Sequence, residues 1–141
     1  MASFVKFNTF VEALAEKVHN LGSDTLKVAL TNTAPTAATD TVFAPGSSHP
    51  PPAAANGYSI QTPAISSSEQ TGGTYKLVLA DVVFTASGGQ IGPFRYAILY
   101  NDTAASDELI AYWDRGSSLT LEDTETFTVD FDAGTGVLTI A

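Results

Sequence analysis

The last half of the chain reads LVLADVVFTA (residues 77–86), GPFRYAILYN (92–101), ELIAYWDRG (108–116), TETFTVDFDA (124–133) and GVLTIA (136–141). Each segment is rich in β-branched and aromatic residues and is bounded by Gly, Pro, Asn, Asp or Ser. Such regularly interrupted apolar runs are typical of an antiparallel all-β domain. In this half we expect strands at residues 74–85, 93–101, 108–114, 117–121, 125–131 and 136–140.

Alternation of side chains indicates how these strands lie. In the strand at 125–131, Phe127, Val129 and Phe131 fall on one face, which we expect to be the buried one. The glycine-containing segment after it predicts a hairpin with the strand at 136–140. In the strand at 93–101, alternation places Phe94 and Tyr96 on the same face.

Two further strands are expected before this half, at residues 24–31 and 57–62. The chain is long enough for one well-packed domain. We therefore predict a single domain over residues 1–141, folded as an antiparallel, jelly-roll-like β-sandwich of about eight strands. Its main body is expected to be residues 57–141.

One segment has helical periodicity. Phe10, Leu14 and Val18 recur at intervals of four residues, which predicts a helix over residues 9–20. Thr9 and Glu12 have the spacing of a capping box, and Gly22 has the position of a helix stop.

Residues 33–56 form a Pro/Ala-rich segment in which we expect a long loop or arm. Three consecutive prolines, Pro50–Pro52, exclude regular helix or sheet. A loop of this length in a compact domain is uncommon and is usually either functional or disordered. Val42 and Phe43 are its only bulky apolar residues, so we expect them to anchor it if it is ordered.

The charge of the chain is low and unevenly placed. Charged residues make up 15% of the sequence and the net charge is −9. Residues 1–76 contribute −1, from four lysines and five acids, and residues 77–141 contribute −8, from two arginines and ten acids. Because an acidic surface repels phosphate backbones, we expect no nucleic-acid partner. No apolar run is long enough to span a membrane and no signal peptide is evident.

Few residues suggest chemistry. The chain has no cysteine, and its two histidines, His19 and His49, fit helix capping and a solvated loop. No nucleophile elbow or phosphate-binding loop is present. Five acidic residues could bind calcium or hydrolyse a glycoside, namely Asp130, Asp132, Asp107, Glu108 and Asp114. The simpler interpretation is that they are solvated ends of strands. We therefore predict no catalytic residue, no metal site and no cofactor.

Aromatic residues are the better indication of function. Tyr112 and Trp113 are neighbours in a strand, so they must point to opposite faces. One of them is expected in the core and the other near the surface, where it would act as an interface anchor. Core packing, as opposed to an exposed interface anchor, remains the default interpretation.

Three stretches resemble a family of small structural proteins of tailed bacteriophages. They are FNTFVEALAEKVHNLGSDTLKVALTNTAP, GPFRYAILYNDT and YWDRGSSLTLEDTETFTVDFDAGTGVLTIA. Members of that family resemble capsid cement, or decoration, proteins. The resemblance implies a jelly-roll sandwich, made in the host cytoplasm and bound in many copies to the outer capsid surface, where it clamps neighbouring major capsid subunits. It also implies a symmetric homo-oligomer, for which we favour a dimer over a trimer.

The first 56 residues are expected to make the binding contacts. The candidate interface residues are Phe10, Leu14, Val18, Val42, Phe43, Pro45, Pro50, Pro51, Pro52, Tyr112 and Trp113. An alternative is a tail-fibre or tail-tip domain that recognises a host surface glycan through Tyr112 or Trp113. A carboxylate-dependent glycosidase is a third hypothesis.

Overall fold

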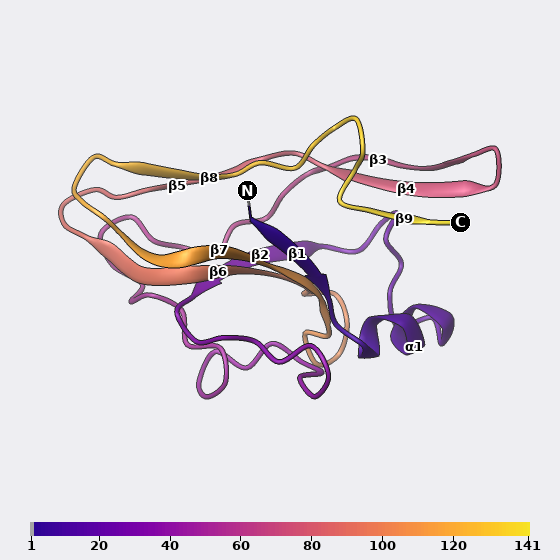
Figure 1. The fold of residues 1–141 in the computed structure, drawn as a ribbon, viewed down its shortest axis with the longest axis horizontal. Helices are drawn as coiled ribbons and strands as arrows, with labels where there is room; N and C mark the ends of the chain where they lie inside the picture. Colours follow the sequence, from indigo (N-terminus) through magenta and orange to yellow (C-terminus); the bar gives the residue numbers. More distant parts are fainter. Residues whose placement is uncertain (1) are drawn as a thin grey trace.

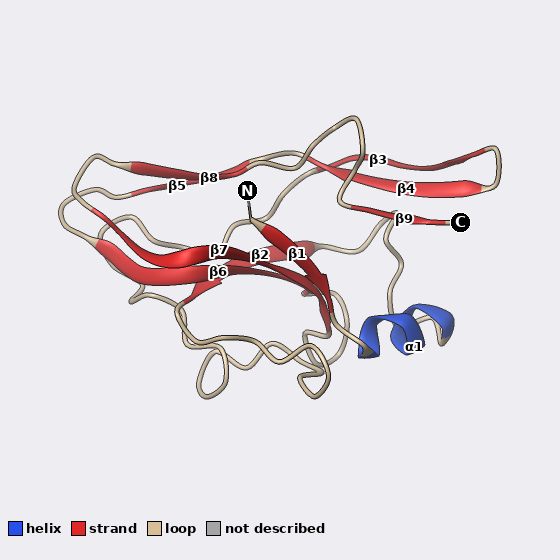
Figure 2. Ribbon diagram, in the orientation of Figure 1, coloured by secondary structure: helices blue, strands red, loops and turns tan. Residues whose placement is uncertain are grey.

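The computed structural model describes residues 2–141, in which short strands predominate over a single short helix (Figure 2). In chain order the elements are β1 (Ser3–Lys6), α1 (Thr9–Ala15), β2 (Leu26–Thr31), β3 (Ile65–Thr71), β4 (Thr74–Leu79), β5 (Val82–Thr85), β6 (Ile91–Asn101), β7 (Leu109–Leu121), β8 (Thr126–Val129) and β9 (Leu138–Ile140). The predicted all-β class is confirmed.

The strands form two layers. A four-stranded main sheet has the order β1-β7-β6-β2, and all its neighbours are antiparallel. The second layer consists of a β5-β8 pair above the main sheet and a β3-β4-β9 sheet that continues this layer to the right, above α1 (Figure 1). The fold is thus a β-sandwich, but the jelly-roll part of the prediction is not confirmed, because the strands divide into three separate sheets.

The main core lies between the two layers. Leu99 and Phe94 on β6 face Phe84 on β5 and Leu77 on β4, and all four side chains are almost fully buried. A second, smaller cluster lies on the opposite face of the main sheet and includes Ile98. The central part of the main sheet, which is β2 with the second half of β6 and the start of β7, is therefore buried on both faces, as its nearly continuous apolar sequence requires.

Several strand predictions are wrong in their bounds. Residues 57–62 form no strand, and only Gln61 bridges to Val28. The predicted strand at 74–85 is two strands, because the chain leaves one small sheet at Ala80 and enters the other at Val82. The two predicted strands between 108 and 121 are one, β7.

The predicted hairpin between the last two strands is also wrong. Strand β8 pairs with β5 and strand β9 pairs with β4, so the segment between them crosses from one small sheet to the other. Asp81 fixes this crossing, since its Oδ1 accepts the Phe131 N–H at 2.8 Å. The alternation is nevertheless confirmed, with Val129 and Phe131 buried and Phe127 packed against the core.

The helix is shorter than predicted, ending at Ala15 rather than at residue 20. Lys17 adopts φ 67°, and the Val18 N–H donates to the Ala13 carbonyl at 2.8 Å. This is the hydrogen-bond pattern of a Schellman stop, formed here by a lysine instead of the expected Gly22. The predicted capping box does not form, because Asn8 is the N-cap and makes no side-chain cap hydrogen bond.

Candidate interaction site

Residues 33–55, here called the loop layer, cover the face of the main sheet that the second strand layer does not cover. Figure 1 shows them as the irregular coil below the main sheet. Residues 33–56 contain no helix or strand, as predicted, beyond one isolated bridge at Val42. The backbone is tied to the sheet on both sides of Val42: the Phe43 N–H donates to Asp107 O at 2.8 Å, and the Leu109 N–H donates to Thr41 O at 3.0 Å.

Phe43 is the apolar anchor of the loop layer. Its side chain is 5% exposed and stacks on Tyr100 of β6, with ring centroids 4.4 Å apart and an angle of 12° between the planes. Burial raises the pKa of the Tyr100 hydroxyl. The prediction that Phe43 anchors this segment is confirmed, and the segment folds back on its own sheet instead of extending away as an arm.

His49 closes the loop layer with Asp40. The Ala44 N–H donates to His49 Nδ1 at 3.1 Å, so this ring nitrogen carries no proton. His49 Nε2 therefore holds the proton and donates it to Asp40 Oδ2, also at 3.1 Å. The same carboxylate oxygen accepts the Thr36 N–H at 2.7 Å. The imidazole is thus neutral, and it joins two turns of the loop layer.

Both histidines lie in surroundings that the sequence did not indicate. His49 was expected in a solvated loop but is 1% exposed. His19 was expected as a cation at the end of the helix, but it lies beyond that end, and Asn101 Nδ2 donates to its Nδ1 at 3.0 Å. Burial lowers the pKa of His19, although Glu108 and Asp24 oppose that shift.

The outer surface of the loop layer is almost free of charge. Between Lys27 and Glu69, Asp40 is the only Asp, Glu, Lys or Arg in the sequence, and its carboxylate is bound to His49. The side chains that reach solvent are mainly proline, alanine, serine and threonine; the exposed ones include Pro45, Ser47, Ser48, Pro50, Ala53, Ala54 and Ala55. Depletion of charge distinguishes the centres of protein interfaces from the rest of a surface. This face is therefore the best candidate interaction site.

The structure brings together part of the predicted interface. Pro45 and Pro50 are exposed on the loop layer, Val42, Pro51 and Pro52 are half-buried, and Phe43 is buried beneath them. Tyr112 packs under the same layer, against the cluster that contains Phe43.

The other predicted interface residues lie elsewhere. Phe10 is 3% exposed in the main core, against which Leu14 packs, so the apolar stripe of α1 faces its own chain. Val18 is half-buried. The exposed large apolar residue of α1 is Val11, which is 53% exposed.

Trp113 lies on the opposite face of β7 from Tyr112, as predicted, and lines a second candidate site. This is a groove of about 750 Å³ at the open side of the sandwich, here called the aromatic groove. The rings of Phe4 and Phe131 approach Trp113 edge-on, each with a centroid distance of 5.4 Å. Tyr96, Arg95 and Arg115 also line the groove, so it offers both aromatic faces and cations.

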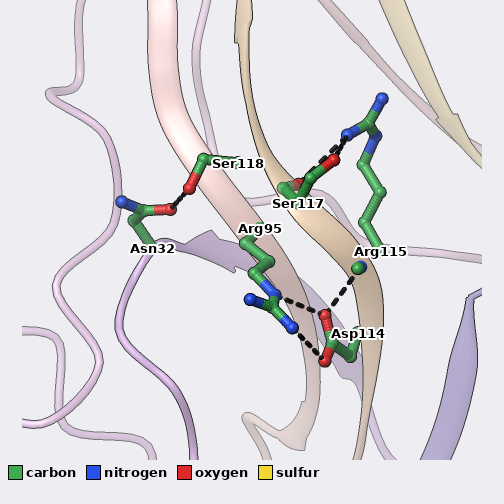
Figure 3. A network of polar contacts seen from close by, with 7 residues as sticks. Asn32, Arg95, Asp114, Arg115, Ser117 and Ser118 are labelled. Atoms are coloured by element: carbon green, nitrogen blue, oxygen red, sulfur yellow. Dashed lines mark hydrogen bonds and ion pairs between the residues drawn. The ribbon is translucent and has the colours of Figure 1, made fainter.

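Both arginines of the aromatic groove already have partners within the chain (Figure 3). Arg95 donates two hydrogen bonds to Asp114, at 2.7 and 2.8 Å, and Arg115 donates to Ser117. The Arg95 hydrogen bonds lower the pKa of the Asp114 carboxyl. A ligand of this groove would have to compete with these bonds or use the remaining N–H donors.

The acidic residues do not gather into a metal site. Across residues 2–141, no three His, Asp or Glu side chains lie close enough together to hold a metal ion. Asp132, one of the two aspartates in the aromatic groove, accepts the Gly134 and Thr135 N–H groups, which lowers its pKa. Glycoside hydrolysis needs one carboxyl with a raised pKa as the acid, and Asp132 does not meet this need.

Comparison with protein-family models, curated proteins and solved structures found no match to this chain. No helix within residues 2–141 is long and apolar enough to cross a membrane.

Proposed function

We propose that this chain is a non-enzymatic virion structural protein that binds the outer surface of a bacteriophage capsid and cements neighbouring major capsid subunits. The sequence resemblance supports this class. The structural observation that supports it is the loop layer, an exposed face without free charge that lies on a rigid sheet. The major capsid protein is the proposed partner of this face.

The energetics favour such a contact. An uncharged surface of proline and alanine loses little hydration when it is covered, whereas an acidic surface would have to desolvate its carboxylates. Because Phe43 and the His49–Asp40 pair already fix the loop layer, binding costs less ordering entropy than a free arm would require. The acidic remainder of the chain then faces solvent and keeps a crowded particle soluble.

Two alanine-to-glutamate variants test this proposal. Ala54 is exposed on the loop layer, and Ala133 is exposed in the turn before β9. We expect Ala54→Glu to weaken binding to purified capsids at least about tenfold, because a carboxylate would be buried without a partner. Ala133→Glu adds the same charge elsewhere and should bind as the unmodified protein does. Equal binding by both variants in a co-sedimentation assay would remove the loop layer from the proposal.

The aromatic groove supports a second candidate function, a tail-fibre or tail-tip domain that binds a host surface glycan. Its supporting observation is that Trp113, with the rings of Phe4 and Phe131 against it, shares one groove with two arginines. The number of copies per particle separates the two candidates: hundreds indicate the capsid and a handful indicate the tail. Quantitative gel analysis of purified particles gives this number.

A further inference from the structure

We propose that two copies of this chain associate through strand β1, so that the main sheets of both copies form one continuous antiparallel sheet. Strand β1 lies at the edge of the main sheet and pairs only with β7. The Phe7 N–H donates to Ile110 O at 3.1 Å, and this fixes the alternation along the strand. Val5 accordingly directs its N–H and C=O toward β7, whereas Phe4 and Lys6 direct theirs outward.

The side chains around this edge are unusually apolar. Four large apolar side chains are clearly exposed in the described part of the chain. Three of them line one groove of about 470 Å³ together with Lys6; they are Phe4 (43% exposed), Val11 (53%) and Ile140 (40%). Exposed edge strands are normally protected by charge, proline or a bulge. Strand β1 contains no proline and no bulge in its pairing with β7, so the short length of the strand and the single charge of Lys6 are its only protection.

The charge distribution identifies a second copy as the occupant. Three of the six lysines and arginines line this groove and the adjoining aromatic groove, namely Lys6, Arg95 and Arg115. Only two of the fifteen acids do so, Asp130 and Asp132. Two chains of charge −9 repel each other over most of their surfaces. At this edge the repulsion is weakest, because three cations lie near Asp130, Asp132 and the Asp114 that is bonded to Arg95.

Strand β1 can also pair with strand β1 of a second copy in an antiparallel register. In an antiparallel pair related by a twofold axis at Val5, Val5 lies opposite Val5 of the second copy, and Phe4 lies opposite the second copy's Lys6. Both outward-directed residues then form backbone hydrogen bonds across the axis. Phe4 and Lys6 line the same groove, so each Lys6 ammonium can lie against the Phe4 ring of the other copy. Such an interface is isologous and closes after two copies.

This inference goes beyond shell binding, because it concerns a different surface and is tested on the purified protein alone. If the loop-layer test fails, the dimer proposal still stands. If the dimer tests fail, the loop-layer proposal still stands.

The first test removes the outward N–H of Lys6. Proline is accepted at this position because the N–H makes no bond to β7, and Val5 before it is already extended. We expect the unmodified protein to sediment as a dimer and Lys6→Pro to sediment as a monomer with an unchanged β-sheet circular dichroism spectrum. Lys6→Ala keeps the N–H and loses the side chain beyond Cβ, including the ammonium, so its dimer dissociation constant should rise no more than about tenfold. A dimeric Lys6→Pro, or an unmodified protein that stays monomeric at its solubility limit, overturns the proposal.

The second test uses the absence of cysteine from the sequence. Val5→Cys places two thiols opposite each other at the twofold axis, within reach of a disulfide. Lys6→Cys places them two residues out of register and serves as the matched control. Under mild oxidation we expect Val5→Cys to form a covalent dimer much faster than Lys6→Cys. Equal rates, or covalent dimers from Lys6→Cys alone, overturn the proposed register.

Discussion

The main sheet is covered on its two faces by layers of different construction. The second strand layer is held to itself by ladders of backbone hydrogen bonds and contributes several large side chains to the main core, among them Leu77, Leu79 and Phe84. The loop layer has no ladder and depends on a single buried aromatic ring, Phe43, and one imidazole–carboxylate pair. A regular layer spreads its stability over many contacts, whereas an irregular layer concentrates it in a few side chains. The two layers should therefore respond differently to the loss of one anchor.

The strand layer should show the largest effect. Phe84 is 1% exposed and stacks on Tyr58 at 5.8 Å, in the centre of the main core. We expect Phe84→Ala to lower the free energy of unfolding by about 4 kcal/mol and to destabilise the whole domain in one transition. Denaturant unfolding followed by Trp113 fluorescence and by circular dichroism should give coincident curves. Two separate transitions would show that the strand layer is not part of the cooperative unit.

Phe43→Ala should have a slightly smaller and more local effect. The lost ring leaves a cavity beside Tyr100, and we expect a cost of about 3 kcal/mol. Because the main core is untouched, amide exchange should accelerate within residues 36–49 and remain slow in β6 and β7. Hydrogen exchange read by mass spectrometry measures both regions in one experiment. A uniform acceleration across the chain would contradict a separately anchored loop layer.

The same contrast explains what could be predicted from the sequence. Strands β2, β6, β7 and β8 carry apolar alternation or apolar runs, so their existence was predictable. Strand β3 was not, because its sequence ISSSEQT is polar and exposed. It is defined by pairing with β4 across the turn at Gly72 and Gly73, whose φ angles of 61° and 88° favour glycine.

Other features depend on contacts between distant residues. The prediction that Phe94 and Tyr96 share a face is wrong, since a bulge in the pairing with β7 turns Phe94 into the main core. No periodicity links His49 to Asp40, because their pairing depends on how the loop folds over the sheet. The length and proline content of the loop did indicate a functional segment, but not that it is a fixed layer.

The His49–Asp40 pair allows a sharper test of how the loop layer is closed. His49→Ala leaves the Ala44 N–H without its acceptor, and we expect a loss of about 2 kcal/mol. Asp40→Asn keeps an oxygen that can accept both the Thr36 N–H and the imidazole N–H. Because the imidazole is neutral, this variant should cost less than about 1 kcal/mol. Thermal unfolding of both variants at neutral pH measures the difference. A large loss in Asp40→Asn would show that His49 is a cation.

The smallest effect concerns His19, which lies between α1 and the main sheet and away from the loop layer. Its pKa is lowered from the ordinary value of 6.5, chiefly by burial. Below pH 6.5, His19 therefore binds a proton in the unfolded chain but not in the folded chain. The stability that His19 contributes is present above this pH, and it is lost as the pH falls toward the lowered pKa. His19→Gln keeps an acceptor for the Asn101 amide and has no proton to gain. As the pH falls below 6.5, we expect the free energy of unfolding of the unmodified protein to decrease more steeply than that of His19→Gln. Parallel pH profiles in urea unfolding would show that the acid sensitivity of this fold arises from its carboxylates and not from the buried imidazole.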